Sequence, residues 1–167
     1  MKAYVALSML VGAAFLSSSA FAQQKSIKDQ LVGTWEVVSW EQVRPDGSKF
    51  HRFGANPKGI QIFDANGRFA IMFFAPDLPK IASNNPSTPS PEELKSLTGR
   101  SIAYYGTYTV DENNKVIDLK IEASSFPNQV GGENKRTVTL ISANELTHQN
   151  TTPLTGGQIN IGAKRAK

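Results

Sequence analysis

Residues 31–43 read LVGTWEVVSWEQV, and they give the clearest indication of the fold class of this chain. Apolar and polar residues alternate along it, as expected for a β-strand. In an ideal strand Trp35 faces one side and Trp40 the other, so the pattern predicts a strand that is covered on both faces for part of its length. Gly33 and Trp35 stand at the head of this strand, just after a short polar segment that begins near Ser26.

Further short strands follow the first one, and turn residues separate them. The turns include Pro45-Asp46-Gly47 and Ala65-Asn66-Gly67, in which Gly and Asn tolerate the positive φ of tight hairpins. Beyond the first run, strands are expected at residues 60–63, 68–74, 103–110, 116–126, 135–141, 145–151 and 157–164. About eight strands with mostly short connections are typical of an all-β, antiparallel up-and-down β-barrel. A β-sandwich is the alternative architecture.

One long connection and one short helix interrupt the run of strands. Residues 75–91 are rich in Pro, Asn, Ser and Thr, which predicts a loop. Ser90 as N-cap, Pro91 at the first helical position and Glu93 three residues after the cap predict a short helix that ends near Gly99. We expect the loop from Asp77 to Pro91 to act as a lid or rim for any site in the barrel.

The first 22 residues have the pattern of an export signal. One Lys precedes an apolar stretch, and small residues ending in Ala20-Phe21-Ala22 provide a cleavage site before Gln23. The expected domains are therefore a signal peptide over 1–22 and a barrel over 23–167. After Gln23, no stretch is long and apolar enough to cross a bilayer as a helix. We therefore expect an exported protein, periplasmic or secreted, with no membrane span after cleavage.

The charge of the chain gives no sign of a nucleic-acid surface. The formal net charge is +4, but Lys2 lies in the expected signal and three more basic residues cluster at 164–167. Without these four, 14 basic residues face 14 acidic ones, so no nucleic-acid partner is expected. The chain has no Cys, which excludes a disulfide framework, a thiolate zinc site and a cysteine nucleophile. No oligomeric state is predicted.

Few residues are candidates for metal binding or catalysis, and none is assigned a catalytic role. His51 and His148 are the only histidines and stand far apart, so neither a metal site nor a cofactor is expected. No GxSxG nucleophile elbow is present, and the Gly pairs lack the strand-to-helix context of a phosphate loop. Asp118 and Glu122 share a face of one expected strand, where they are expected to form a cross-strand ion pair with Arg136.

Several segments resemble the bacterial lipocalin-like domain family, whose members are calycin-type β-barrels of poorly defined function. The matching segments are LVGTWEVVSWE, FGxxPxG at 53–59, DxxGR at 64–68, AYYGTYTVDE at 103–112 and FPNQVG at 126–131. The resemblance implies that Gly33 lets the chain close over one barrel end, and that Trp35 plugs this end under a basic side chain, here Arg165. Two positions depart from the family pattern. Leu119 and Lys120 stand where members often carry His, and Gln129 stands where they carry an aromatic residue.

The resemblance, together with strands rich in Tyr and Phe, predicts a protein that binds a small, largely apolar molecule in the barrel mouth. Trp40, Phe73 and Phe126 are the expected apolar walls. Of the three tyrosines at 104, 105 and 108, Tyr105 and Tyr108 are the expected hydroxyl contacts, and Arg136 is the expected charge anchor. One alternative is a barrel-type isomerase or cyclase that acts on a small hydrophobic substrate. The other alternative is an envelope protein-binding module, which would have a closed interior and an exposed apolar patch.

Overall fold

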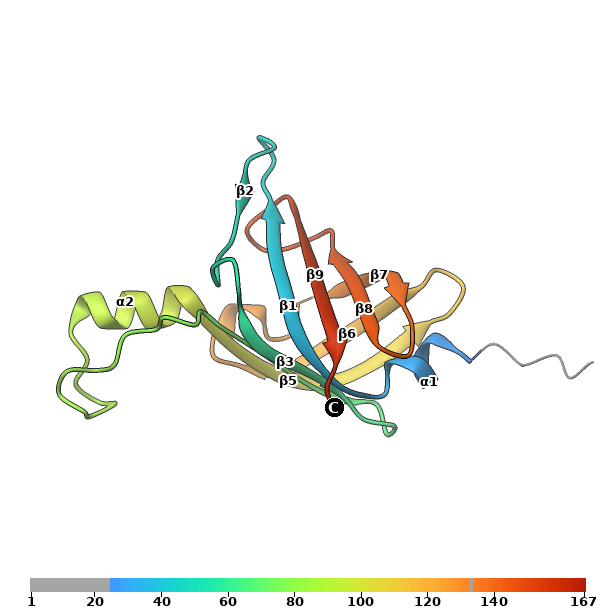
Figure 1. Ribbon diagram of the computed structural model, residues 1–167, viewed down its shortest axis with the longest axis horizontal. Coiled ribbons are helices and arrows are strands. Elements are labelled where there is room, and N and C mark those ends of the chain that lie inside the picture. The colour runs from blue at the N-terminus through green and yellow to red at the C-terminus, as the bar shows by residue number, and fades with distance from the viewer. Residues whose placement is uncertain (1–24, 133) are drawn as a thin grey trace, which may run out of the picture.

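The chain forms a single antiparallel sheet that closes on itself (Figure 1). The structure is a computed structural model that describes residues 25–132 and 134–167, so the expected signal peptide at 1–22 lies outside the described residues. The elements in chain order are α1 (Ile27–Leu31), β1 (Gly33–Val43), β2 (Lys49–Phe50), β3 (Lys58–Phe63), β4 (Arg68–Phe74), α2 (Pro91–Arg100), β5 (Ser101–Asp111), β6 (Val116–Ser124), the 3₁₀ turn η1 (Pro127–Gln129), β7 (Lys135–Ile141), β8 (Glu145–Asn150) and β9 (Gln158–Arg165).

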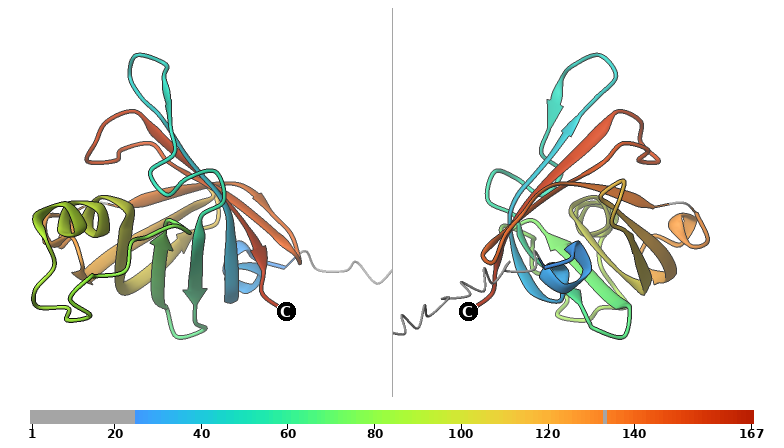
Figure 2. Two further views of the ribbon diagram at one scale, coloured as in Figure 1. Left: turned by 60° about the vertical axis from the view of Figure 1, so that its left-hand side comes forward. Right: turned by 90° about the vertical axis from the view of Figure 1, so that its right-hand side faces the viewer.

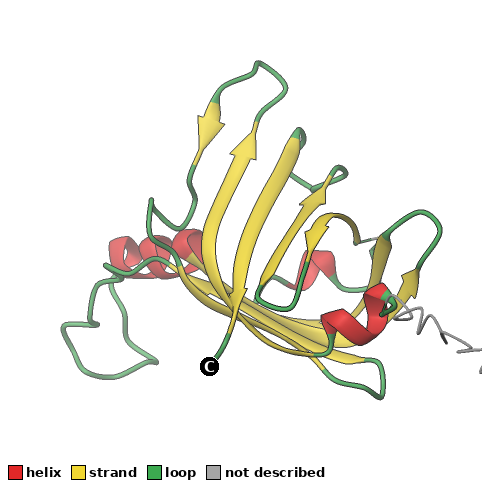
Figure 3. Cartoon of the chain, turned by 45° about the vertical axis from the view of Figure 1, so that its right-hand side comes forward, coloured by secondary structure: helices red, strands yellow, loops and turns green. Residues whose placement is uncertain are grey.

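Pairing of the first and last long strands closes the barrel. β1 pairs with β3 on one side and with β9 on the other, and the strands between follow one another in chain order. This gives an 8-strand barrel, while the two residues of β2 only extend β1 as a hairpin. Figure 3 shows the strands curling round the interior. The predicted antiparallel up-and-down barrel is confirmed, and the sandwich is excluded.

The expected elements appear within a few residues of their predicted ends. The capping box of α2 forms as expected, since Glu93 N donates to Ser90 Oγ at 3.2 Å and Ser90 N donates to Glu93 Oε2 at 2.7 Å. Alternation of apolar residues did not indicate α1, β2 or η1. Each has five residues or fewer, which is too short for a periodic pattern to emerge.

The two Trp residues of β1 both face the interior, so the prediction of a strand covered on both faces is wrong. A β-bulge shifts the register between Val37 and Ser39. Trp35 and Val37 are buried before the bulge, and Trp40 and Gln42 are buried after it. The extra residue of a bulge changes which alternate side chains point inward. Ser39 is consequently exposed on the outer surface.

One end of the barrel is closed by Trp35, as the family resemblance implied. The indole is fully buried, donates from Nε1 to Leu31 O at 2.8 Å, and lies 4.1 Å from the guanidinium carbon of Arg165. Arg165 also donates to Val32 O, at 2.9 Å, and to the carbonyls of Gln30 in α1 and Ala143 in the loop between β7 and β8. Gly33 has a φ of 134°, and a Cβ there would lie 2.5 Å from Nη1 of Arg165. Glycine is therefore required for this closed end.

The short helix α1 completes the closed end. Glu112 accepts hydrogen bonds from Ile27 N and Lys28 N at 2.8 and 2.9 Å, which ties the helix N-terminus to the end of β5. Leu31 is fully buried in the core beside Trp35. At the opposite end of the barrel, which we call the open end, no such plug is present among the described residues.

The segment between β4 and β5 does not cover the open end. Figures 1 and 2 show that the Pro-rich loop and α2 project beyond the barrel wall. α2 has no buried residue, and no residue between Phe73 and Ile102 lines the cavity described below. The expectation that the loop from Asp77 to Pro91 forms a lid or rim is therefore wrong. None of the helices in the described ranges is long and apolar enough to cross a membrane.

Candidate functional site

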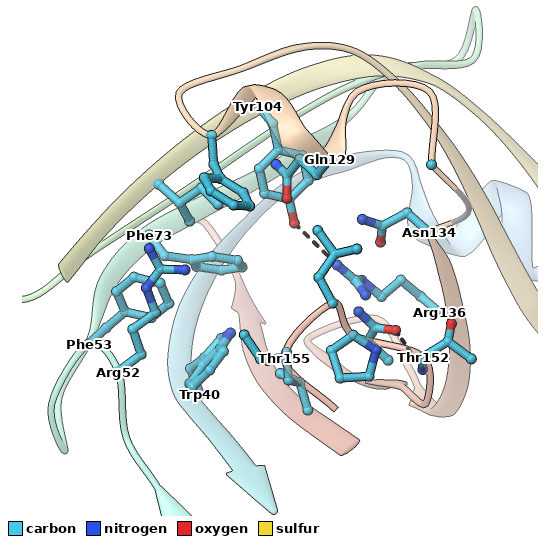
Figure 4. A pocket seen from close by; sticks show the side chains of 17 residues that line it. Trp40, Arg52, Phe53, Phe73, Tyr104, Gln129, Asn134, Arg136, Thr152 and Thr155 are labelled. Atoms are coloured by element: carbon cyan, nitrogen blue, oxygen red, sulfur yellow. Dashed lines mark hydrogen bonds between the residues drawn. The ribbon is translucent and has the colours of Figure 1, made fainter. Parts of the chain in front are cut away.

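A cavity of about 120 Å³ opens at the end of the barrel opposite Trp35 (Figure 4). Its walls come from the strand ends that meet there, including Trp40 of β1, Phe73 of β4 and Ile102 of β5. Its rim comes from two loops, one after β6 and one between β8 and β9. The rim residues are Phe126, Gln129, Gly132, Thr152, Pro153, Leu154 and Thr155. One water needs about 10–15 Å³ measured in this way, so the space exceeds that of a few waters.

Aromatic rings form the apolar side of the cavity. Phe53 packs edge-on against Trp40, with ring centroids 5.1 Å apart, and lies 5.5 Å from Phe73. All three side chains are at least nine-tenths buried. Phe126, on the rim, is 45% exposed. The cavity therefore has a rigid aromatic wall inside and an exposed aromatic ring at its entrance, an arrangement suited to an apolar ligand.

A single arginine supplies charge inside the cavity. Arg136 of β7 is only 5% exposed, and its Nη2 donates to the Tyr104 hydroxyl at 3.4 Å. Its Nε and Nη1 have no hydrogen-bond partner. The expected ion pair with Asp118 and Glu122 does not form, because Arg136 points inward while Glu122 faces outward and pairs with Arg68 at 2.9 Å. The described residues of the barrel therefore leave the guanidinium largely unpaired.

A neutral polar pair lies next to Arg136, one step closer to the closed end. The His148 ring bonds through Nε2 to Gln61 Oε1 at 2.8 Å, and this bond links β8 to β3 across the interior. Burial, and secondarily the positive charge of Arg136, lower the pKa of His148 to about 3. His148 is therefore neutral at pH 7, and Arg136 keeps an uncompensated charge. Among the described residues, no group of three His, Cys, Asp or Glu side chains could hold a metal ion.

A second arginine stands at the edge of the cavity but has other partners. Arg52 donates to the carbonyls of Gly99, Thr98 and Ser101 at 2.8, 3.0 and 3.3 Å. These carbonyls belong to the C-terminal end of α2 and the start of β5, where a positive charge is favoured by the helix dipole. Arg52 thus fastens α2 to the barrel, and burial lowers its pKa.

Four of the six residues predicted to bind ligand meet around this cavity: Trp40, Phe73, Phe126 and Arg136. Tyr105 does not, because its side chain is 48% exposed on the outer wall. Tyr108 is buried, but near the closed end, where its hydroxyl donates to Asp64 O at 2.7 Å. Burial, with the nearby negative charge of Asp64, raises the pKa of this hydroxyl.

Tyr105 and Tyr108, the predicted hydroxyl contacts, do not line the cavity. The alternation of side chains along a strand already argues against choosing these two together. Residues three apart in a regular strand lie on opposite faces, so Tyr105 and Tyr108 cannot both point inward. Tyr104 shares the inward face with Tyr108 and is the one that reaches the cavity. Phe53, Arg52 and the loop around Thr155 were also missed. They come from irregular segments, and no periodic pattern indicates where such side chains point.

Comparison with known proteins gives one family and several distant structures. The sequence profile of the lipocalin-like domain family matches residues 32–165. No curated protein matches this chain in sequence. A solved lipocalin-like protein from Bacteroides uniformis is 15% identical and aligns over 81% of this chain and 98% of its own, with a TM-score of 0.44. A de novo fluorescence-activating β-barrel is 14% identical over 86% of this chain and 100% of its own, with a TM-score of 0.46.

Proposed function

Because this chain belongs to the lipocalin-like domain family, we propose that it binds a small, largely apolar molecule in the cavity at the open end of its barrel. The observation that carries the proposal is the pairing of an aromatic wall with a buried, largely unpaired Arg136 in one cavity. Binding sites for small molecules are mostly apolar and contain a few polar groups that fix orientation. Trp40, Phe73 and Phe126 contact the apolar part of the ligand, and Arg136 contacts its polar end.

The cavity sets the size of the part of the ligand that is enclosed. An apolar cavity of roughly 150 Å³ accepts a benzene ring, and the cavity here measures about 120 Å³. One ring or a short alkyl chain fills it. The remainder of a larger ligand passes between the rim loops, where Leu154 is 70% exposed and Phe126 is 45% exposed.

The open cavity and its donors also help to compare ligand binding with the two alternative functions, a protein-binding module and an isomerase or cyclase. A protein-binding module predicts a closed interior, so the open cavity supports ligand binding over that alternative. An isomerase or cyclase needs donors aimed at a substrate carbonyl, and Arg136 with Tyr104 provides such donors. The cavity and its residues serve both functions, but no His, Asp, Glu, Lys or Cys side chain that could act as a general acid or base lines the cavity among the described residues. Simple binding is therefore the better supported function.

An NMR titration tests the proposal directly. The ¹⁵N-labelled protein is titrated with p-cresol, a neutral ring compound that matches the cavity in size. We expect saturable shift changes at the strand ends that line the cavity, around Trp40, Phe73 and Ile102, and none around Trp35. Uniform small shifts over the whole surface would contradict a site in the barrel mouth.

A matched pair of variants separates a mouth site from binding elsewhere. Gln129 lies on the rim of the cavity, and Gln129→Trp places a bulky ring over the entrance. Gln149 faces outward on β8, so Gln149→Trp makes the same chemical change away from the cavity. We expect the first variant to weaken p-cresol binding at least tenfold and the second to leave it within twofold. Equal behaviour of the two variants would overturn the proposed location.

We also propose that the protein is exported to the periplasm or secreted. The support is the signal-like segment 1–22, which lies outside the described residues. N-terminal sequencing of the protein recovered from the cell envelope or the medium should begin at Gln23. Recovery from the cytosol with residues 1–22 attached would refute export.

A further inference from the structure

Resting on the proposed function, we propose that the ligand is a monocarboxylic acid, whose carboxylate is bound by Arg136 and Tyr104 while its apolar part contacts the aromatic wall. The cavity has hydrogen-bonding capacity and charge that the described residues of the barrel do not satisfy, and a carboxylate would satisfy both.

The guanidinium of Arg136 has donors that need an acceptor. It carries five N–H donors and cannot lose its proton. Only one bond is made, to the Tyr104 hydroxyl, and at 3.4 Å it is longer than an ordinary hydrogen bond. Nε and Nη1 are both buried without a partner. A neutral acceptor could bind one of these donors. A carboxylate suits them better, because its two oxygens can accept hydrogen bonds from two donors at once.

The charge of the cavity also needs an anion. The charged side chains that line the cavity, in the described part of the chain, are Arg52 and Arg136, and no Asp or Glu is among them. None of the ion pairs formed by described residues includes Arg136. A buried charge without a counter-charge is costly, and an arriving carboxylate removes that cost while gaining a charge-assisted hydrogen bond.

Tyr104 supplies a second donor at the same point. Its hydroxyl oxygen accepts from Arg136, so its own hydrogen remains for another acceptor. Figure 4 shows the Tyr104 hydroxyl and the Arg136 guanidinium directed toward each other from facing strands. A carboxylate placed beside them receives one bond from each residue, which fixes both its position and its orientation.

The surroundings favour a single negative charge over two. Arg52 already donates to three carbonyls at the end of α2, so one guanidinium remains for the ligand. His148, next to Arg136, is neutral and offers no second positive charge. A carboxylate matches the single charge of Arg136, whereas a dianion would need donors from a second cation, and Arg52 already uses its Nε and Nη2 donors on backbone carbonyls.

The test compares two ring compounds of the same size, one with a negatively charged carboxylate and one with a neutral carboxamide. The affinities of 4-methylbenzoate and 4-methylbenzamide are measured at pH 7 by NMR titration of the wild-type protein. We expect the acid to bind at least tenfold more tightly. We expect Arg136→Met to reduce this preference below twofold, because the variant loses far more affinity for the acid than for the amide. Arg68→Met removes an equal charge on the outer surface and should leave the preference unchanged.

A second variant makes the result independent of how Arg136→Met folds. Tyr104→Phe keeps the ring and removes only the hydroxyl, and we expect it to weaken acid binding threefold to tenfold and to lower the preference for the acid over the amide. Equal affinity of the wild-type protein for acid and amide would overturn this inference and leave the proposed function intact. Absence of binding by either compound to the folded protein would overturn both. An unchanged preference in both cavity variants would show that the acid binds elsewhere, and would overturn the inference.

Discussion

Replacing Arg136 by Met should stabilise the ligand-free protein, which is the opposite of what most core substitutions do. Arg136 is 5% exposed, has two unpartnered nitrogens and makes one bond of 3.4 Å. Met keeps the unbranched apolar stem of the side chain and ends before the position of the guanidinium group. The substitution loses one weak hydrogen bond and removes an unpaired buried charge.

The size of the effect follows from known replacements of buried charges. Exchanging a buried ion pair for apolar residues of similar volume is often neutral or stabilising by about 1–4 kcal/mol, and a single unpaired charge has no Coulombic attraction to lose. Because the lost hydrogen bond to Tyr104 is long, we expect the free energy of unfolding to rise by roughly 1–3 kcal/mol. For a chain of this size the midpoint of thermal unfolding should rise by about 2–4 °C for each kcal/mol.

Equilibrium unfolding in urea, followed by tryptophan fluorescence, measures the change. Arg68→Met is the control, since Arg68 is an exposed partner of Glu122 and surface ion pairs contribute roughly 0–1 kcal/mol. With 4-methylbenzoate at 100 times its dissociation constant, the wild-type protein should gain about 2.7 kcal/mol, and the variant much less. Destabilisation of ligand-free Arg136→Met by 1 kcal/mol or more, relative to the control, would refute the reasoning, because it would mean that the guanidinium is already compensated.

Three further predictions concern other parts of the barrel. The pKa of His148 is about 3 in the folded protein against an ordinary value of 6.5. Between these two pH values the unfolded chain binds more protons at this residue than the folded protein does. The free energy of unfolding therefore decreases as the pH falls from 6.5 toward 3. Between pH 7 and pH 5 this loss should be roughly 2 kcal/mol by urea unfolding, and a His148→Gln variant should lack it. Arg165→Met removes hydrogen bonds to three carbonyls and the contact with Trp35. We expect the free energy of unfolding, measured by thermal unfolding, to fall by roughly 2–4 kcal/mol. An unchanged unfolding midpoint would contradict the role of Arg165 at the closed end. Tyr105→Ala, on the outer wall, should leave the affinity for p-cresol within twofold by NMR titration, and a tenfold loss would place the ligand outside the barrel.

The barrel itself could be predicted from the sequence because its signals are local. Turn residues such as Asn66-Gly67 end the strands, and alternation within each strand marks its two faces. The closed end was also predictable, since Gly33, Trp35 and a late basic residue form a recognisable pattern. The predictions that were wrong concern residues beside irregularities in a strand, where the alternation of inward and outward side chains is interrupted. The bulge between Val37 and Ser39 turns Trp40 inward, and it has no signature in the sequence.

The candidate site was predicted in part for the same reason. Phe73 and Arg136 lie in regular strands, and the structure places both at the cavity. The ion pair expected for Arg136 failed because the face of β7 that points inward is set by its register with β6, which sequence alternation alone leaves open. The rim could not be assigned, since Phe53 and Thr155 belong to loops whose course is fixed by contacts across the fold.

Native mass spectrometry of the protein purified from its own source tests most directly whether the barrel mouth holds a small molecule. We expect a species heavier than the polypeptide by the mass of one small organic acid, which disappears when the protein is denatured or when Gln129→Trp fills the entrance. A native mass equal to that of the bare polypeptide in every preparation, with no acid released on denaturation, would contradict ligand binding in the barrel mouth.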